Sequence, residues 1–212
     1  MNSVDVENKI DKKNIRGLIL FGDSVFAGVG ATHRNHGCGK IVKKNSEVDI
    51  FIKAHSLDTT RDALAKINTY VLNRQKYSHV IILFGNNDCR LVGYDTPAVS
   101  LDEYKNNLLS IITQLKNANK IPFISNLQPI NENLFRHTLP QVARYMKMIK
   151  SAYEWQKQYS DICRMIANAE KTVLLDIRSN LEKYNDVISE DGLHPNDKGH
   201  QIIADQILEV LE

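Results

Sequence analysis

The chain has 212 residues, 42% hydrophobic and 25% charged, with a formal net charge of +2. This length is sufficient for one domain with a sizeable core. The small net charge and the scattered Lys and Arg residues give no strong field that would attract nucleic acid, so we expect no nucleic-acid partner. The sequence leaves the oligomeric state open.

The cysteines and the N-terminus bear on where the protein works. Cys38, Cys89 and Cys163 show neither an even count nor a CxxC spacing, which favours reduced thiols over a disulfide framework. Residues 1–14 are polar and lack the apolar run of a signal peptide, and no later stretch is long enough to span a bilayer. If the printed chain is the natural one, we expect a cytoplasmic protein without membrane insertion, with a polar tail before one domain (residues 15–212).

Short apolar runs alternate with longer amphipathic segments. The runs predict buried strands at residues 17–21, 48–52, 80–84, 121–124 and 172–176. Capping residues and helical periodicity predict helices near Lys40, after Asp58-Thr59-Thr60, from Ser100, from about Gln141 and after Asn196. Continuously apolar strands separated by helices are typical of a parallel sheet covered by helices on both faces.

The region from residue 126 onward is expected to border the functional site. We predict a loop over residues 126–140, in which Leu127, Leu134 and Phe135 line an apolar wall. The long helix that follows carries a stripe of aromatic and aliphatic side chains, which we interpret as core rather than as a ligand-binding surface. The stripe comprises Val142, Tyr145, Met146, Ile149, Tyr153 and Tyr159.

Polar motifs follow the predicted strands. Ser24 comes directly after the first strand, Asp58 follows the second by several residues, and Asn87 follows the third. In open parallel sheets the ligand site lies beyond the carboxyl ends of the strands. These three residues are therefore expected to meet at one edge of the sheet, and Asp191 and His194 near the end of the chain offer possible partners for Ser24.

These residue types suit acyl transfer. Ser24 can act as the nucleophile and His194 as the base, with Asp191 selecting the imidazole tautomer. The side-chain amide of Asn87 and backbone N–H groups near Ser24 and Leu57 can form an oxyanion hole. Each motif alone is also ordinary turn or cap chemistry, and only their combination favours catalysis.

The motifs resemble those of a known family. Gly22-Asp23-Ser24, Gly85-Asn86-Asn87-Asp88 and Asp191-Gly192-Leu193-His194-Pro195 resemble the first, third and fifth blocks of the SGNH hydrolases, also called GDSL esterases and lipases. The resemblance spans Gly17 to the final helix. It implies a flavodoxin-like three-layer α/β/α fold with about five parallel strands. It also implies hydrolysis of a small-molecule or sugar ester without a metal or other cofactor, by a triad of Ser24, Asp191 and His194.

The second block is where this chain departs from the family. Leu57 stands in the segment Lys53–Thr60 where the family has the Gly whose N–H joins Asn87 in the oxyanion hole. The N–H survives this change, but Leu adopts a positive φ poorly. We therefore expect Leu57 to tilt the donor or to narrow the acyl pocket, which favours a small acyl group such as acetyl.

Three alternatives remain at this level. Gly28-Val29-Gly30 begins a nucleotide-binding fingerprint, but His33 replaces its third glycine. His33, His36 and Cys38 are closely spaced and soft enough for zinc, although no fourth ligand is evident. A relative that has redirected the same serine to acetyl transfer, or a silent carbohydrate-binding relative, would share the motifs.

Overall fold

The computed structural model describes residues 15–211, so the tail predicted for residues 1–14 lies outside the described part of the chain. The strands are β1 (Leu18–Gly22), β2 (Ile50–Ala54), β3 (His79–Leu83), β4 (Leu91–Gly93), β5 (Thr96–Pro97), β6 (Ile121–Ser125) and β7 (Val173–Leu175). The helices are α1 (Ser24–Ala27), α2 (Cys38–Asn45), α3 (Thr60–Ile67), the π-helical segment η2 (Asn68–Leu72), α4 (Leu101–Asn117), α5 (Glu132–Thr138), α6 (Pro140–Ala143), α7 (Ala152–Glu170), α8 (Ile177–Leu181) and α9 (Asp197–Leu211).

The five predicted strands form one parallel sheet in the order β2-β1-β3-β6-β7. Their bounds differ from the predicted ones by at most two residues. The chain moves from β1 to β2 in one direction and then returns past β1 to β3, so the order reverses between β1 and β3. This reversal is the switch point at which flavodoxin-like sheets bind ligands.

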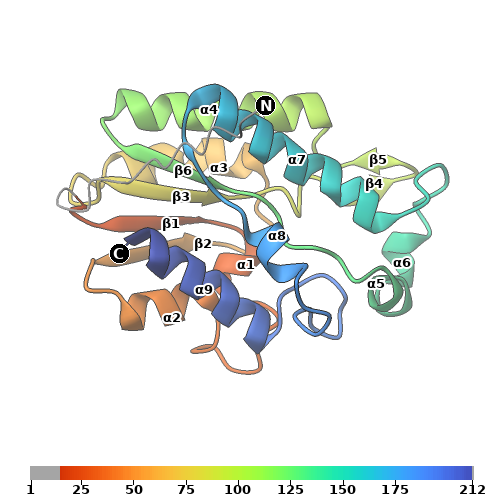
Figure 1. The fold of residues 1–212 in the computed structure, drawn as a ribbon. Helices are drawn as coiled ribbons and strands as arrows, with labels where there is room; N and C mark the ends of the chain where they lie inside the picture. The colour runs from red at the N-terminus through yellow and green to blue at the C-terminus, as the bar shows by residue number, and fades with distance from the viewer. Residues whose placement is uncertain (1–14, 212) are drawn as a thin grey trace, which may run out of the picture.

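Both faces of the sheet are covered by helices, which gives three layers (Figure 1). Side chains alternate along β1, so Ile19 and Phe21 pack toward α3, α4 and α7, while Leu18 and Leu20 pack toward α2 and α9. Burial on both faces explains why the strands read as continuous apolar runs. The predicted α/β fold with helices on both faces is confirmed.

The long helix predicted from Gln141 is wrong, and so is the loop predicted over residues 126–140. The structure has α5 within that loop, one helical turn in α6, an irregular segment over residues 144–151, and α7 only from Ala152. The Asp95 carboxylate holds the irregular segment by accepting the N–H groups of Lys147, Met148 and Ile149 at 3.0–3.2 Å. These N–H groups are consequently diverted from helical bonds. Asp95 lies in the unpredicted hairpin β4–β5.

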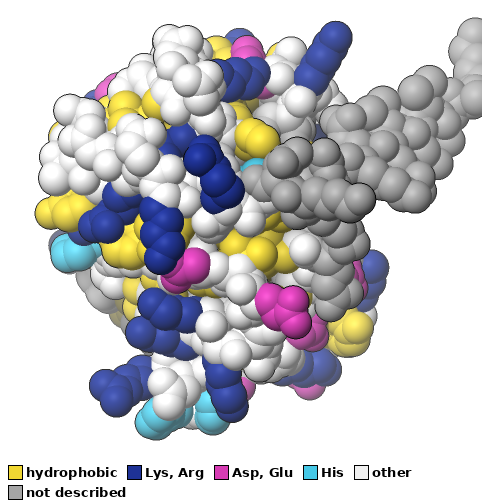
Figure 2. Space-filling model, turned by 90° about the vertical axis from the view of Figure 1, so that its left-hand side faces the viewer, with side chains coloured by type: hydrophobic (Ala, Val, Ile, Leu, Met, Phe, Trp, Pro, Cys, Tyr) yellow, Lys and Arg dark blue, Asp and Glu magenta, His cyan; other side chains and the backbone are white. Residues whose placement is uncertain are grey.

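Figure 2 views the molecule from the edge at which the strands begin, opposite their carboxyl ends. Lys and Arg side chains are spread over this face, and Asp and Glu side chains lie among them (Figure 2). No helix within residues 15–211 is long and apolar enough to cross a membrane.

Candidate active site

Ser24 is held at the turn that follows β1. Asp23 caps α1, because its Oδ1 accepts the Val25 N–H at 3.0 Å, and Ser24 is the first helical residue. The turn sits tightly on β3: a Cβ at Gly22 would lie 2.7 Å from the Leu83 carbonyl oxygen. The buried strand β1 and the Asp23 cap together fix the Ser24 backbone at the carboxyl edge of the sheet.

Ser24, His194 and Asp191 form a chain of hydrogen bonds. Ser24 Oγ lies 2.9 Å from His194 Nε2, and His194 Nδ1 lies 2.6 Å from Asp191 Oδ2. In this geometry Nε2 can accept the serine proton while Nδ1–H donates to the carboxylate. The structure thus brings together three residues that lie up to 170 positions apart, in the order predicted from the sequence.

Asp191 is fixed by its own loop. Its Oδ1 accepts bonds from Ser189 Oγ at 2.8 Å and from the N–H groups of Leu193 and His194 at 2.8 and 2.9 Å. Burial alone would raise the pKa of Asp191, but these bonds and that of the imidazole outweigh it and hold the pKa well below its ordinary value. Asp191 is therefore a carboxylate at neutral pH. Gly192 at φ +74° permits the tight loop, since a Cβ there would lie 2.1 Å from the Phe135 nitrogen.

Three candidate oxyanion donors border the same cavity as Ser24 Oγ. Asn87 Nδ2 donates one hydrogen to the Asp58 carbonyl at 2.9 Å, which leaves its second N–H available. Among residues 15–211 no acceptor engages the backbone N–H groups of Ser24 and Leu57. Leu57 adopts φ +71°, which costs about 1–2 kcal/mol for a residue with a Cβ. Leu57 is 69% exposed and also lines the cavity, so it lies at the mouth of the cavity.

An apolar cavity of about 200 Å³ adjoins Ser24 and His194. It lies between the sheet edge, the hairpin β4–β5, α5, α6 and the start of α7. Its apolar lining consists of Val29, Leu57, Leu91, Ile130, Phe135, Leu139, Val142, Met146, Ala152, Trp155 and Leu193. Trp155 is fixed there by its Nε1–H bond of 2.8 Å to the Cys89 carbonyl.

The predicted apolar wall is only partly as expected. Phe135 lines the cavity, but Leu134 and Leu127 do not. Leu134 lies exposed on the surface, and Leu127 is fully buried in the core between the sheet and α7, with its N–H bonded to Ser160 Oγ. Val142 and Met146, interpreted as core from their spacing, lie on the cavity wall. Trp155 also lines the cavity and was not predicted from the sequence. The irregular segment over residues 144–151, which carries Met146, is held by Asp95, which lies far away in the sequence. Helical periodicity is a local pattern, so it could not predict this segment.

A buried polar network braces the site from behind. Asn86 Nδ2 donates to Asp23 Oδ2 at 3.1 Å, and Asn86 Oδ1 accepts bonds from Gln128 Nε2 at 3.0 Å and Gln156 Nε2 at 2.9 Å. Gln128 Nε2 also donates to the Leu193 carbonyl at 3.0 Å. Gln128 therefore links the turn that carries Ser24 to the loop that carries His194.

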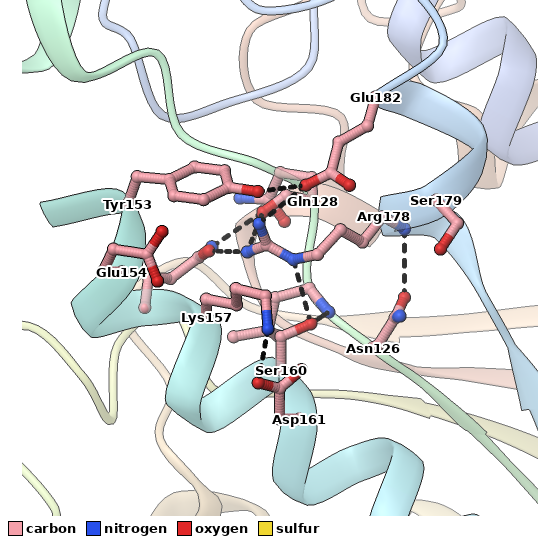
Figure 3. Close-up of polar contacts among 12 residues, drawn as sticks. Asn126, Gln128, Tyr153, Glu154, Lys157, Ser160, Asp161, Arg178, Ser179 and Glu182 are labelled. Atoms are coloured by element: carbon pink, nitrogen blue, oxygen red, sulfur yellow. Dashed lines mark hydrogen bonds and ion pairs between the residues drawn. The ribbon is translucent and has the colours of Figure 1, made fainter.

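Arg178 anchors this network (Figure 3). It projects from α8, is 3% exposed, and donates to the Gln128 carbonyl and to Ser160 Oγ at 3.2 and 3.1 Å. It also bonds Gln156 Oε1. The guanidinium thus holds α7, α8 and the segment after β6 in one arrangement.

Asp23, which the sequence assigns to the turn, is fully buried. Burial raises its pKa to about 6, although the bonds from Val25 and Asn86 and the nearby His194 oppose this shift. Its structural place agrees with the sequence-based interpretation of Asp23 as a turn residue rather than a reacting group.

The side chains that suggested a zinc site do not lie together, and the glycine that suggested nucleotide binding has a packing role. Cys38 is buried and its Sγ donates to the Val25 carbonyl, whereas His36 Nδ1 lies at the surface, 2.8 Å from Asp197 Oδ2. Within the described residues no group of three or more His, Cys, Asp or Glu side chains is placed to hold a metal ion. At Gly30, φ is +95°, and a Cβ would lie 2.3 Å from the Pro195 carbonyl oxygen. This glycine is thus accounted for by packing against the histidine loop.

A three-layer α/β fold with a Ser-His-Asp chain at its switch point defines a class of ester-bond hydrolases. The sequence model of the GDSL-like Lipase/Acylhydrolase family matches residues 20–202, and the chain belongs to this family. It is an enzyme of the ester-bond hydrolase type.

The chain is also similar to individual proteins along most of its length. The chain is 26% identical to the uncharacterized lipoprotein YqeF of Bacillus subtilis, over 90% of this chain and 87% of that protein. It is also 26% identical to the GDSL esterase/lipase WDL1 of Oryza sativa subsp. japonica, over 92% of this chain and 77% of that protein. The crystal structure of the lipase/acylhydrolase from Enterococcus faecalis superposes with a TM-score of 0.74 at 20% identity, covering 92% of this chain and 94% of that one.

Proposed function

We propose that the protein hydrolyses a carboxylic ester through an acyl-enzyme on Ser24. The observation that carries this proposal is the hydrogen-bonded chain Ser24–His194–Asp191, with distances of 2.9 and 2.6 Å, at the edge of an apolar cavity. An assembled nucleophile, base and orienting group is what acyl transfer requires.

In the first half of the reaction, Ser24 Oγ attacks the ester carbonyl carbon while His194 Nε2 takes the hydroxyl proton. The oxygen that becomes negative accepts bonds from the Ser24 and Leu57 N–H groups and from Asn87 Nδ2. The imidazolium is stabilised by Asp191. The tetrahedral intermediate then collapses: the bond to the alcohol oxygen breaks, and His194 returns the proton to the leaving alcohol.

In the second half, water attacks the acyl-enzyme and His194 takes its proton. Collapse of the second tetrahedral intermediate breaks the bond to Ser24 Oγ, which recovers the proton. The acid is released, and the enzyme returns to its starting state. No redox partner is needed for this balance.

The cavity favours an apolar acyl group larger than acetyl. An engineered cavity of about 150 Å³ in another protein binds benzene, which has twice the heavy atoms of an acetyl group. The cavity beside Ser24 is about 200 Å³ and nearly all its lining is apolar. The acetyl preference expected from Leu57, which lines this cavity, stays a prediction.

A chain-length series tests the acyl assignment. Hydrolysis of p-nitrophenyl acetate, butyrate and octanoate is compared in the parent, in Val142→Trp, and in Ser24→Ala as the blank. Val142 lines the cavity, so the indole ring of Val142→Trp should fill part of the space for a long acyl chain. We expect kcat/KM to fall for octanoate and to change little for acetate. Equal losses for all three esters, or a parent that turns over acetate best, would contradict the proposed acyl group.

Transfer of the acyl group to a sugar or another alcohol is the alternative outcome of the same acyl-enzyme. An alcohol acceptor added to the ester assay separates the two reactions. Hydrolysis predicts that free acid remains the main product, whereas a main product that carries the acyl group on the acceptor would identify a transferase. A silent binding protein would give neither product.

We also propose that the protein works in the cytoplasm. Its three cysteines are all unpaired, which suits a reducing compartment. Because one relative is named a lipoprotein, the test is fractionation of the native host with an antibody to the full chain. Recovery in an exported fraction would contradict the proposal.

A further inference from the structure

Exposed apolar side chains gather around the mouth of the cavity. Within residues 15–211 the three most exposed large hydrophobic side chains are Met148 at 81%, Leu57 at 69% and Tyr94 at 59%. Leu57 lines the cavity, Met148 lies two residues beyond the lining residue Met146, and Tyr94 belongs to the hairpin that supplies Leu91. We call the surface of the hairpin β4–β5 and residues 144–150 the apolar rim.

The apolar rim is held together as one unit. The Asp95 N–H donates to the Tyr145 carbonyl at 2.9 Å, and the Asp95 carboxylate accepts three consecutive N–H groups from residues 147–149. The rings of Tyr94 and Tyr145 lie 5.7 Å apart. Because the backbone of both segments is pinned in this way, Tyr94 and Met148 are presented outward from neighbouring segments.

The apolar rim is also the cationic part of this edge. Residues 139–153 contain three exposed cations, Arg144, Lys147 and Lys150, and no acidic residue. Exposed Arg90 directly precedes the hairpin, and the carboxylate within the hairpin is Asp95, which accepts the backbone N–H groups of residues 147–149. Lys147 Nζ lies 3.7 Å from the centre of the Tyr94 ring, so cation and apolar surface are adjacent. The rim therefore holds three cations and one carboxylate, a net charge of +2, and Arg90 adjoins it.

We propose that the apolar rim docks the enzyme on an anionic lipid surface, from which an ester with an apolar chain enters the cavity. Scattered apolar side chains among unpaired cations are typical of segments that lie in the interface of an anionic membrane. The inference rests on the proposed function for what the docked enzyme does, while the docking itself follows from the rim alone.

Vesicle flotation tests the docking with the full chain. Vesicles of phosphatidylcholine are compared with an equimolar mixture of phosphatidylcholine and phosphatidylglycerol, at low and at high salt. The parent should float with the mixed vesicles, less so at high salt, and should not float with phosphatidylcholine alone. Each cation near an anionic surface is worth about fivefold in binding, so Lys147→Gln should weaken binding by about that factor. Lys105→Gln, an exposed lysine on α4, is the matched control and should bind like the parent.

The apolar half of the rim has its own pair of variants. Met148→Ser should weaken flotation, whereas Met165→Ser, at a 47% exposed methionine of α7, should leave it unchanged. Neither Met148 nor Lys147 lines the cavity, so all four variants should keep the parent's turnover of soluble p-nitrophenyl butyrate. That turnover reports on the proposed function independently of flotation.

Several outcomes would overturn the docking proposal. These are a parent that does not float with the mixed vesicles, equal flotation with both vesicle types, and rim and control variants that weaken binding equally. A dimer that Met148→Ser dissociates, measured by analytical ultracentrifugation without lipid, would assign the rim to a second copy of the chain instead.

Discussion

Replacing Gln128 with Leu probes the brace that joins the two halves of the site. Gln128 is fully buried, and its side-chain amide bonds both Asn86 and the Leu193 carbonyl. In Gln128→Leu, Asn86 keeps a partner on each amide atom, namely Asp23 on Nδ2 and Gln156 on Oδ1. The Leu193 carbonyl, however, has no other donor among the described residues.

The cost of the substitution follows from this count. One part-buried carbonyl left without a donor costs about 1–3 kcal/mol of unfolding free energy. Leu193 precedes His194, so loss of the bond also loosens the base. A misplacement of about 1 Å at a reacting group lowers the rate by about a hundredfold, and we expect kcat to fall at least tenfold with KM changed less.

Two measurements check this reasoning. Urea unfolding should give the loss of stability, and p-nitrophenyl butyrate kinetics should give the split between kcat and KM. Gln201→Leu is the matched control, because Gln201 is exposed on α9 and bonds only Asp205 within the same helix. If Gln128→Leu were destabilised as expected but kept the parent's kcat, Gln128 would be a structural residue and would not position His194.

Three further substitutions test other parts of the account. Burial raises the pKa of Asp88 to about 6, although the bonds from Thr60 oppose this shift, so its contribution to stability is present below about pH 4 and is lost as the pH rises through 6. Asp88→Asn should remove this pH dependence of the free energy of unfolding, which is worth up to about 3 kcal/mol. The reasoning is refuted if urea unfolding gives the variant the same change of unfolding free energy with pH as the parent. Leu57→Gly relieves the positive φ but adds chain entropy, so stability should change by less than about 1 kcal/mol; a large gain of octanoate over acetate hydrolysis would support the idea that Leu57 narrows the pocket. Asp95→Ala removes the acceptor of three N–H groups and should speed tryptic cleavage within residues 144–151, whereas an unchanged cleavage rate would show that another contact holds the segment.

The sheet and its edge were predictable because they depend on local patterns. Continuous apolar runs gave the five strands, and the residue that follows each strand falls at the carboxyl edge whatever the helices do. Asn196 was expected to cap the last helix, and its Oδ1 accepts the Gly199 N–H at 3.0 Å. The positions of Ser24 and Asn87 follow from the same rule, whereas Asp191 and His194 were placed beside them on the combination of motifs and the family resemblance; the catalytic roles of all four stay predictions.

The cavity was not predictable because distant residues build it. Val142 and Met146 have the spacing of a buried helix stripe, but α6 ends at Ala143, and the chain beyond it donates the N–H groups of residues 147–149 to the distant Asp95 carboxylate instead of continuing as a helix. Leu127 is an apolar residue in the segment that was predicted to border the site, but its side chain lies in the core just after β6. Gln128 likewise bonds Asn86, which lies 42 positions before it, and Leu193, which lies 65 positions after it. No local sequence pattern predicts such distant contacts.

Covalent labelling shows whether Ser24 is an activated nucleophile. The full chain is treated with a fluorophosphonate at neutral pH and its intact mass is measured, beside Ser24→Ala and His194→Ala. The account predicts one adduct on the parent, located to Ser24 by peptide mapping, absent from Ser24→Ala and weak in His194→Ala. A parent that forms no adduct, or an adduct that persists in Ser24→Ala, would contradict it.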